Sequence, residues 1–320
     1  RAAPDLLVCH VPEDTPRDDL RVFLRVLFRS GFTSRVDVVL LFPGMTSSLR
    51  FEGIVREETE SFLKLLDGYK VAEKKKVDGL LRFDVGRFLR SGRKEAKEPL
   101  WGKKKGSGFI RNVTESTRSG YGSVVSFEAS ELDPEDSLAG FIDHVSIGLR
   151  RWGCYSMLLG RLRRNYKHVV LVNAKSQLVL DDPLNNIKNV SAESVHVFRK
   201  PIKRNSDKAT PRGGQVNSAV LMGGARGIRR LSSLMLTEIV RTAMQQKHKR
   251  RNPVTESGVL NQLVGNGHVL KNVNVVESTD SIFELDSLDG LDSGSRDTRN
   301  NYSVIQRGSG NRELNLAVMK

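Results

Sequence analysis

Residues 171–184 read LVNAKSQLVLDDPL, and this stretch decides the fold that the sequence predicts. The apolar residues 169–172, which directly precede Asn173, are typical of a strand buried in a sheet. A short polar turn and a second short strand follow, and Pro183 ends that strand because proline has no N–H to donate to a sheet. The polar side chains of the turn, Asn173 and Ser176, therefore stand at the end of a buried strand.

Strands and helices alternate before this stretch. Residues 5–12, DLLVCHVP, predict a buried strand that ends at proline. Thr15 is suited to cap the next helix and Pro16 to form its first turn, and residues 35–44, RVDVVLLFPG, predict the next strand. A strand, a helix and a strand within about 40 residues form the βαβ unit of a parallel sheet. A second amphipathic helix is expected over residues 56–69.

The alternation continues through the rest of the chain. A helix is expected directly before the quoted strand, with apolar residues every three or four positions: Val145, Leu149, Trp152, Tyr155, Leu159, Leu162 and Tyr166. Further strands are predicted over residues 194–200, 216–227 and 273–278, with helices after Gly227 and over 255–267. We therefore expect an α/β fold with a mostly parallel central sheet flanked by helices.

Composition separates a core from three polar segments. Only 38% of the residues are apolar, which indicates loops or a tail beside the core. Residues 70–120 are rich in Lys and Arg and predict a basic insertion. Residues 200–214 predict a basic, flexible loop, and residues 287–320 predict a disordered tail because they are rich in Asn, Ser and Gly. A single domain is therefore expected over residues 1–286.

The net charge limits the classes of partner. A formal charge of +15 favours an anionic partner, such as nucleic acid, an acidic membrane or a small phosphate ligand, unless it serves solubility alone. Nucleic acid has little support because aromatic residues for base stacking are few in the basic insertion. Cys9 and Cys154 are too few for a disulfide framework or a zinc site. No apolar run approaches the length of about 18 residues that a membrane span needs.

Three blocks, taken in order, resemble a known family. They are GLRRWGCYSMLLGRLRRNYKHVVLVNAKSQLVLDDPL (148–184), VNSAVLMGGARGIRRLSSLMLTEIVR (216–241) and VTESGVLNQL (254–263). They resemble the nucleotide-diphospho-sugar transferase fold, the GT-A class of glycosyltransferases, and look similar to uncharacterised plant members of that class. The similarity spans roughly residues 5–286, with the insertion inside it. It implies a GT-A-like sheet and a sugar nucleotide as the ligand.

The resemblance also bears on a metal ion. In that family the central strand ends in an acidic motif that binds a divalent cation, but Asn173 and Ser176 stand at those places here. Neutral oxygens bind Mn²⁺ or Mg²⁺ more weakly than carboxylates do. Asp181 and Asp182 are the nearest acids that could serve as metal ligands, or they cap the turn before Pro183. The expectation is a cation site that is weakened or absent.

Further site residues follow from the same comparison. Asn217, Ser218, Gly223 and Gly224 match a later strand and turn of the family, and Glu256 matches an acid on a later helix. His10 ends the first strand, at the edge where ligands bind in open α/β sheets, or is simply a hydrogen-bonded histidine there. The predicted nucleotide-sugar-binding residues are His10, Asn173, Lys175, Ser176, Asn217, Ser218, Gly223 and Gly224. Glu256 is the predicted catalytic residue, although a carboxylate in the first turn of a helix has a structural explanation too.

Three functions stay open. The first is a glycosyltransferase-like protein that binds a sugar nucleotide donor, with an unspecified acceptor, and that is active or inactive. The second is a non-catalytic relative that serves binding or scaffolding. The third is a basic protein that binds nucleic acid or acidic lipid. Because the chain opens with Arg1 and not methionine, we expect the membrane anchor common in this class upstream, and a location in the Golgi or another secretory lumen.

Overall fold

The computed structural model describes a core assembled from separate parts of the chain. The described residues are 4–73, 123–126, 144–162, 166–185, 191–199, 215–247, 254–265, 270, 274–278, 282–284 and 303–307. Most of the predicted basic insertion (70–120), the whole loop 200–214 and most of the predicted tail (287–320) lie outside the described residues.

Seven of the described strands form one sheet, in the order β3-β2-β1-β4-β7-β6-β8. The strands are β1 (Asp5–His10), β2 (Val36–Phe42), β3 (Ser123–Ser126), β4 (His168–Asn173), β6 (Ser194–Arg199), β7 (Val216–Gly224) and β8 (Asn274–Ser278). β1, β2, β3 and β4 run parallel, β7 runs antiparallel to both β4 and β6, and β8 is parallel to β6. The predicted α/β fold with a mostly parallel sheet flanked by helices is confirmed.

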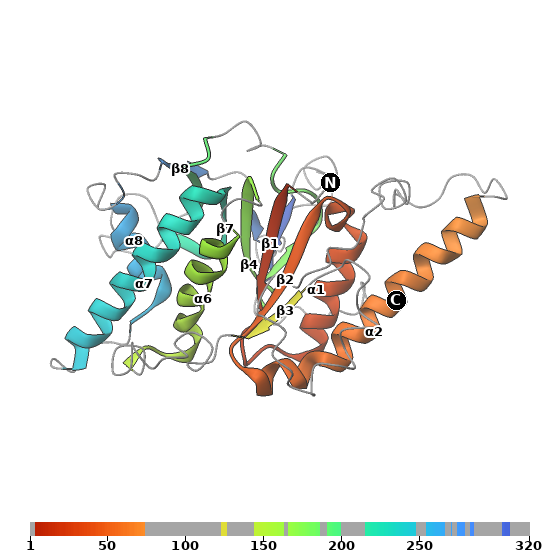
Figure 1. Ribbon diagram of the computed structural model, residues 1–320, viewed down its shortest axis with the longest axis horizontal. Helices are drawn as coiled ribbons and strands as arrows, with labels where there is room; N and C mark the ends of the chain where they lie inside the picture. The colour runs from red at the N-terminus through yellow and green to blue at the C-terminus, as the bar shows by residue number, and fades with distance from the viewer. Residues whose placement is uncertain are drawn as a thin grey trace, which may run out of the picture.

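Helices α1 (Arg17–Arg29) and α2 (Met45–Glu73) cover one face of the sheet (Figure 1). The apolar stripe of α1 is buried against alternate residues of β1 and β2, such as Leu7 and Val38. Gly31 follows α1 with a φ of 75°, which glycine adopts without steric cost. This layer closes the first hydrophobic core.

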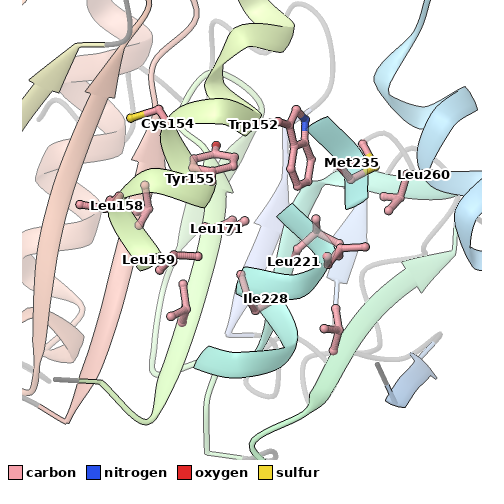
Figure 2. Packing of buried hydrophobic residues seen from close by; sticks show 14 of the residues in the cluster. Trp152, Cys154, Tyr155, Leu158, Leu159, Leu171, Leu221, Ile228, Met235 and Leu260 are labelled. Atoms are coloured by element: carbon pink, nitrogen blue, oxygen red, sulfur yellow. The ribbon is translucent and has the colours of Figure 1, made fainter. Parts of the chain in front are cut away.

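Helices α6 (Ile147–Arg161), α7 (Ala225–Lys247) and α8 (Glu256–Gly265) cover the opposite face. Every apolar residue that the sequence assigned to the face of α6 and its flanks is buried. Figure 2 shows Tyr155 and Leu158 of α6 over the strands that carry Leu171 and Leu221, with Met235 of α7 beside them. Strand residues alternate between the two cores, because successive side chains point to opposite faces.

Two helix starts differ from the prediction. α2 begins at Met45 and not near residue 56, because Phe51 and Ile54 are fully buried and extend its apolar face backwards. Thr15 does not cap α1: its hydroxyl donates to the carbonyl of Pro12 at 2.7 Å, and Pro16 is the residue before the helix. A local turn thus uses the hydroxyl that was expected at the helix end.

A second, three-stranded sheet has the order β5-β10-β9, from β5 (Gln177–Val179), β9 (Ile282–Glu284) and β10 (Val304–Gln306). β10 lies inside the predicted disordered tail, so that prediction is wrong for residues 303–307. Val304 is 1% exposed and packs in the first core, which gives this short segment a reason to be ordered. Polar neighbours on both sides hid the strand in the sequence. Within the described residues, no helix is both long and apolar enough to cross a membrane.

Candidate functional site

The strand order reverses between β1 and β4. The chain moves outward from β1 to β2 and β3, and then returns to place β4 on the other side of β1. His10 and Asn173, the last residues of these two strands, are direct neighbours in the register. Open α/β sheets bind ligands outside the carboxyl ends of the strands at such a reversal. We call the sheet edge at His10 and Asn173 the carboxyl edge, and the edge at Asp5 and His168 the amino edge.

Strand alternation puts both side chains on the α6 face. Leu6 and Val8 of β1, and Val169 and Leu171 of β4, all pack in the core under α6. Side chains two residues apart share a face, so His10 and Asn173 follow them there. A small pocket with about 230 Å³ of empty space, part of it open to solvent, lies at this place. Its lining residues are His10, Arg151, Trp152, Tyr155, Leu171, Val172, Asn173, Ser218, Ala219, Leu221 and Glu256.

Glu256 connects α8 to α6 inside this pocket. Its Oε1 accepts a hydrogen bond of 2.8 Å from the indole Nε1 of Trp152, and its Oε2 forms an ion pair with Arg151. The side chains of Arg151 and Glu256 are 9% and 15% exposed. Charges shielded from water in this way interact more strongly than surface pairs. The predicted catalytic residue therefore lies in the pocket, but both its carboxylate oxygens have partners.

Two other polar groups of the pocket are held neutral by burial. Burial lowers the pKa of His10 well below its ordinary value, and the positive charge of Arg151 adds to the shift. Burial raises the pKa of the Tyr155 phenol, against the opposing charge of Arg151. The ring of Tyr155 lies edge-on to that of Trp152, with centroids 5.3 Å apart. His10 is thus a neutral imidazole that can donate or accept a hydrogen bond at neutral pH.

The turn after β4 uses Asn173 locally. Its Oδ1 accepts a hydrogen bond of 3.0 Å from the backbone N–H of Lys175, and the Asn173 carbonyl accepts one from Ser176 at 3.3 Å. This is an Asx turn, a common reason for asparagine after a strand. Lys175 forms an ion pair with Asp14, and the hydroxyl of Ser176 is buried. These three predicted binding residues lie together at the carboxyl edge.

The first residues of β7 reach the same edge because β7 runs antiparallel to β4. Ser218 lines the pocket, and its hydroxyl lies 3.3 Å from that of Ser257 on α8. Asn217 is buried: its Oδ1 accepts from the N–H of Ala219, and its Nδ2 donates to Gln306 of β10 at 2.8 Å. The structure therefore brings Ser218 to the pocket, with Asn217 next to it and facing the small sheet.

Gly223 and Gly224 are not part of this group. They pair with Val169 and His168 at the amino edge, about 15 Å along the strand from Asn173 at about 3.3 Å per residue. A Cβ on either glycine would lie within 2.3 Å of a carbonyl oxygen in the segment 192–194, so close packing explains them. The N–H groups of Ala225 and Gly227 donate to the carbonyls of Lys167 and Ala192. The structure therefore does not bring these two predicted binding residues together with His10 and Asn173.

Asp181 and Asp182 also lie away from Asn173. Asp182 is 2% exposed, pairs with Arg35 at 3.1 Å, and accepts the N–H of Leu184 at 2.9 Å. Arg35 directly precedes β2, so this ion pair belongs to the amino edge. Asp181 accepts the N–H of Asp182 at 2.7 Å. The two acids cap their turn, as the structural alternative predicted, and the structure does not bring them together with Asn173.

The residues at the carboxyl edge do not fit a Mn²⁺ or Mg²⁺ ion. Hard cations need several oxygen ligands, with carboxylates among them. The Asn173 oxygen already accepts a backbone hydrogen bond, and the Glu256 carboxylate is held by Arg151 and Trp152. No group of three or more His, Cys, Asp or Glu side chains in the described parts of the chain is placed to hold a metal. The pocket offers hydrogen bonds and one guanidinium charge instead.

Sequence reasoning missed Arg151 and Trp152 as site residues. Both lie on α6, where Trp152 was expected only as a core residue and the sequence pattern gave Arg151 no role. Arg151 is 8% exposed, and its Nη1 also donates to the carbonyl of Gly148. Its sequence neighbour Arg150 looks identical in the pattern but donates to the Val145 carbonyl at 3.1 Å. Arg151 lies four residues before Tyr155 on the buried side of α6, and α8 supplies Glu256 as its partner there.

The profile of a family described as "Domain of unknown function (DUF7780)" matches residues 1–281. The chain belongs to this family. The DUF7780 match covers every described element except β9 and β10. No curated protein matches the chain.

Solved structures give a distant likeness to this DUF7780 protein. Mouse xyloside xylosyltransferase 1, in its apo form, is 11% identical with a TM-score of 0.44, covering 96% of this chain and 98% of that one. The glycosyltransferase GlyE of Streptococcus pneumoniae TIGR4 is 8% identical with a TM-score of 0.39, covering 86% of this chain but only 45% of its own. Similarity of this degree does not establish a common activity.

Proposed function

We propose that this protein binds a sugar nucleotide at the carboxyl edge between β1 and β4, as a glycosyltransferase-like protein. The observation that carries the proposal is the pairing of His10 with Asn173 where the strand order reverses, on the face where a pocket lies. The ordered sequence blocks that resemble the GT-A class contribute Asn173, Ser218 and Glu256 to this same pocket. The sequence resemblance and the position of the pocket are separate observations, and they agree.

The chemistry of the pocket suits such a ligand. Neutral His10, Asn173 and Ser218 offer hydrogen bonds to hydroxyl and carbonyl groups of a sugar or base. Trp152 and Tyr155 add apolar and aromatic surface, which is typical of small-molecule sites. Because the acidic residues for a divalent cation are not assembled there, we expect binding to be independent of Mn²⁺ and Mg²⁺.

Thermal unfolding against a panel of uridine and guanosine diphosphate sugars, each with EDTA or with Mn²⁺, tests the proposal. A ligand at 100 times its dissociation constant stabilises the native state by about 2.7 kcal/mol, which is an easily measured shift. We expect one class of donor to raise the melting temperature equally with and without Mn²⁺. Ser218→Leu should abolish the shift by filling the pocket, while Thr237→Leu, at an exposed position on α7, should keep it.

A non-catalytic role has its own support. Glu256 is held by Arg151 and Trp152. The resemblance to the GT-A class implies an acid at the place of Asn173, and the Asn173 oxygen instead accepts a backbone hydrogen bond. An assay for hydrolysis of the bound donor to a free sugar and a nucleoside diphosphate distinguishes an active enzyme from a non-catalytic binding protein. Turnover would indicate an enzyme, and donor binding without turnover would indicate a binding protein. No thermal shift with any donor, or a shift with DNA or acidic lipid alone, would contradict the proposed function.

A further inference from the structure

Two donors converge on one carboxylate in the pocket. Arg151 and Trp152 are consecutive on α6, and their guanidinium and indole N–H groups bind different oxygens of Glu256. Arg151 is 8% exposed and Trp152 is 1% exposed. Packing therefore holds both side chains in place, and their N–H groups point at one position, which an anionic carboxylate occupies. That anion belongs to the protein itself.

Arg151 is the one basic side chain among the pocket's lining residues, apart from His10, which burial holds neutral. Any phosphate that enters this pocket meets Arg151 as its source of positive charge. Guanidinium groups suit phosphate because their N–H groups match two of its oxygens. In the structure, the guanidinium of Arg151 is already paired with the carboxylate of Glu256.

The pocket is also small while Glu256 is in place. Its cavity volume is about 10 Å³, far below the range of roughly 300–1,000 Å³ that is usual for ligand sites. Glu256 is the first residue of α8, and its side chain is 15% exposed, so it borders solvent on the side to which a ligand would displace it. Its charge would still lie at the positive end of α8 after rotation. Moving this single side chain would both enlarge the pocket and release the two donors.

We propose that Arg151 and Trp152 form an anion subsite for a ligand diphosphate, and that Glu256 is its built-in occupant, displaced when the ligand binds. This inference rests on the proposed function for the identity of the ligand. Arg151 then supplies the positive charge that a metal ion supplies in many diphosphate sites. The Trp152 indole supplies one further hydrogen bond, and no cation from solution is required.

Substitution of each partner tests the subsite, because the two changes act in opposite directions. Glu256→Gln removes the competing charge, and we expect at least about tenfold tighter binding of pyrophosphate and of a nucleoside diphosphate in EDTA. Arg151→Gln should weaken both by about tenfold or more, the loss expected for a hydrogen bond to a charged group. Trp152→Phe keeps the ring but loses the N–H, so a smaller loss is expected. Isothermal titration calorimetry gives the affinities.

Stability alone cannot produce this pattern. Each single substitution leaves an unpaired buried charge, so both Glu256→Gln and Arg151→Gln should lower the melting temperature of the free protein. A purely structural ion pair would therefore change ligand affinity in the same direction in both variants, or in neither. Glu193→Gln is the matched control. It removes the same charge from a pair with Arg226 and Arg230 at the other end of the sheet, and it should leave affinity unchanged.

The outcomes separate this inference from the proposed function. If the wild type binds a sugar nucleotide but Glu256→Gln binds pyrophosphate no more tightly, the subsite is refuted while the proposed function stands. If no donor binds the wild type but Glu256→Gln binds pyrophosphate, and Arg151→Gln in that background abolishes it, the subsite stands and the proposed function fails. Failure of every variant to bind either probe overturns both.

Discussion

At the scale of single residues, the buried His10 at the carboxyl edge makes the stability of the protein depend on pH. His10 is 3% exposed at the end of β1, and burial together with Arg151 lowers its pKa. In the unfolded chain the same imidazole has its ordinary pKa of about 6.5. As pH falls below that value, the unfolded state takes up a proton that the folded state does not. The contribution of His10 to the free energy of unfolding is therefore fully present above the ordinary histidine pKa and is lost as the pH falls below it.

His10→Gln removes this group, and we expect it to flatten the pH dependence of stability between pH 7.5 and 5. The contribution of one such histidine approaches about 1.4 kcal/mol per pH unit below its unfolded pKa. Urea denaturation at several pH values measures the slope. Ser218→Ala, a change in the same pocket with no titratable group, should keep the wild-type slope. Equal slopes for His10→Gln and the wild type would show that His10 takes up a proton in the folded state.

At the scale of elements, β10 connects the far end of the chain to the carboxyl edge. The N–H of Leu180 donates to Ser303 at 2.8 Å, and the N–H of Arg307 donates to Ser176 at 2.8 Å. Arg307 also binds the first turn of α1, where its Nη2 donates to the Asp19 carbonyl at 2.9 Å. Because Gln306 binds Asn217, this short strand contacts β7 as well as the turn after β4. It thereby helps fix the segments that carry Asn173 and Ser218.

Val304 is the main apolar anchor of this strand. Val304→Ala removes two buried methyl groups, and we expect a loss of about 1.6 kcal/mol of unfolding free energy at about 0.8 kcal/mol per group. Chemical denaturation measures the loss. Ile305→Val is the control: Ile305 is half-buried and loses one methylene group, so a smaller effect is expected. If Val304→Ala costs nothing, β10 does not stay docked on β5 in solution.

At the scale of the whole molecule, two hydrophobic cores share one sheet. Successive side chains of β1 point into different cores: Leu6 and Val8 lie on the α6 face, and Leu7 and Cys9 lie on the α1 face. The same strands contribute side chains to both cores. If either layer of helices unpacks, one face of these strands is exposed to water, and the sheet that supports the other layer loses stability. Cooperative unfolding of both layers follows from this arrangement.

We therefore expect one unfolding transition for the two layers. In a Trp101→Phe background, Trp152 fluorescence reports on the α6 layer, while hydrogen exchange of the buried α1 amides reports on the other. The urea midpoints from the two measurements should coincide. Ser233→Ala, at an exposed position, serves as a control that should leave both midpoints together. Separate midpoints would mean that the layers are independent units.

The sequence by itself determined the main strands and helices of the two cores. The strand over residues 168–173, the buried face of α6 and the buried residues of α7 follow from the period of the apolar residues, which is a local property of the chain. The placement of His10 and Asn173 at strand ends follows from the same period. The ends of α2 and the strand β10 did not follow, because buried apolar residues there are mixed with polar neighbours.

Only the tertiary structure decided which of the polar residues meet. Arg151 and Glu256 lie 105 residues apart, and they pair because α6 and α8 cover the same face of the sheet. Gly224 is near Ser218 in the sequence but at the opposite edge, because a strand carries its two ends far apart. Asp182 is near Asn173 in the sequence, yet β5 leads it to Arg35 at the amino edge. Strand order and direction depend on long-range packing, and no local period in the sequence encodes them.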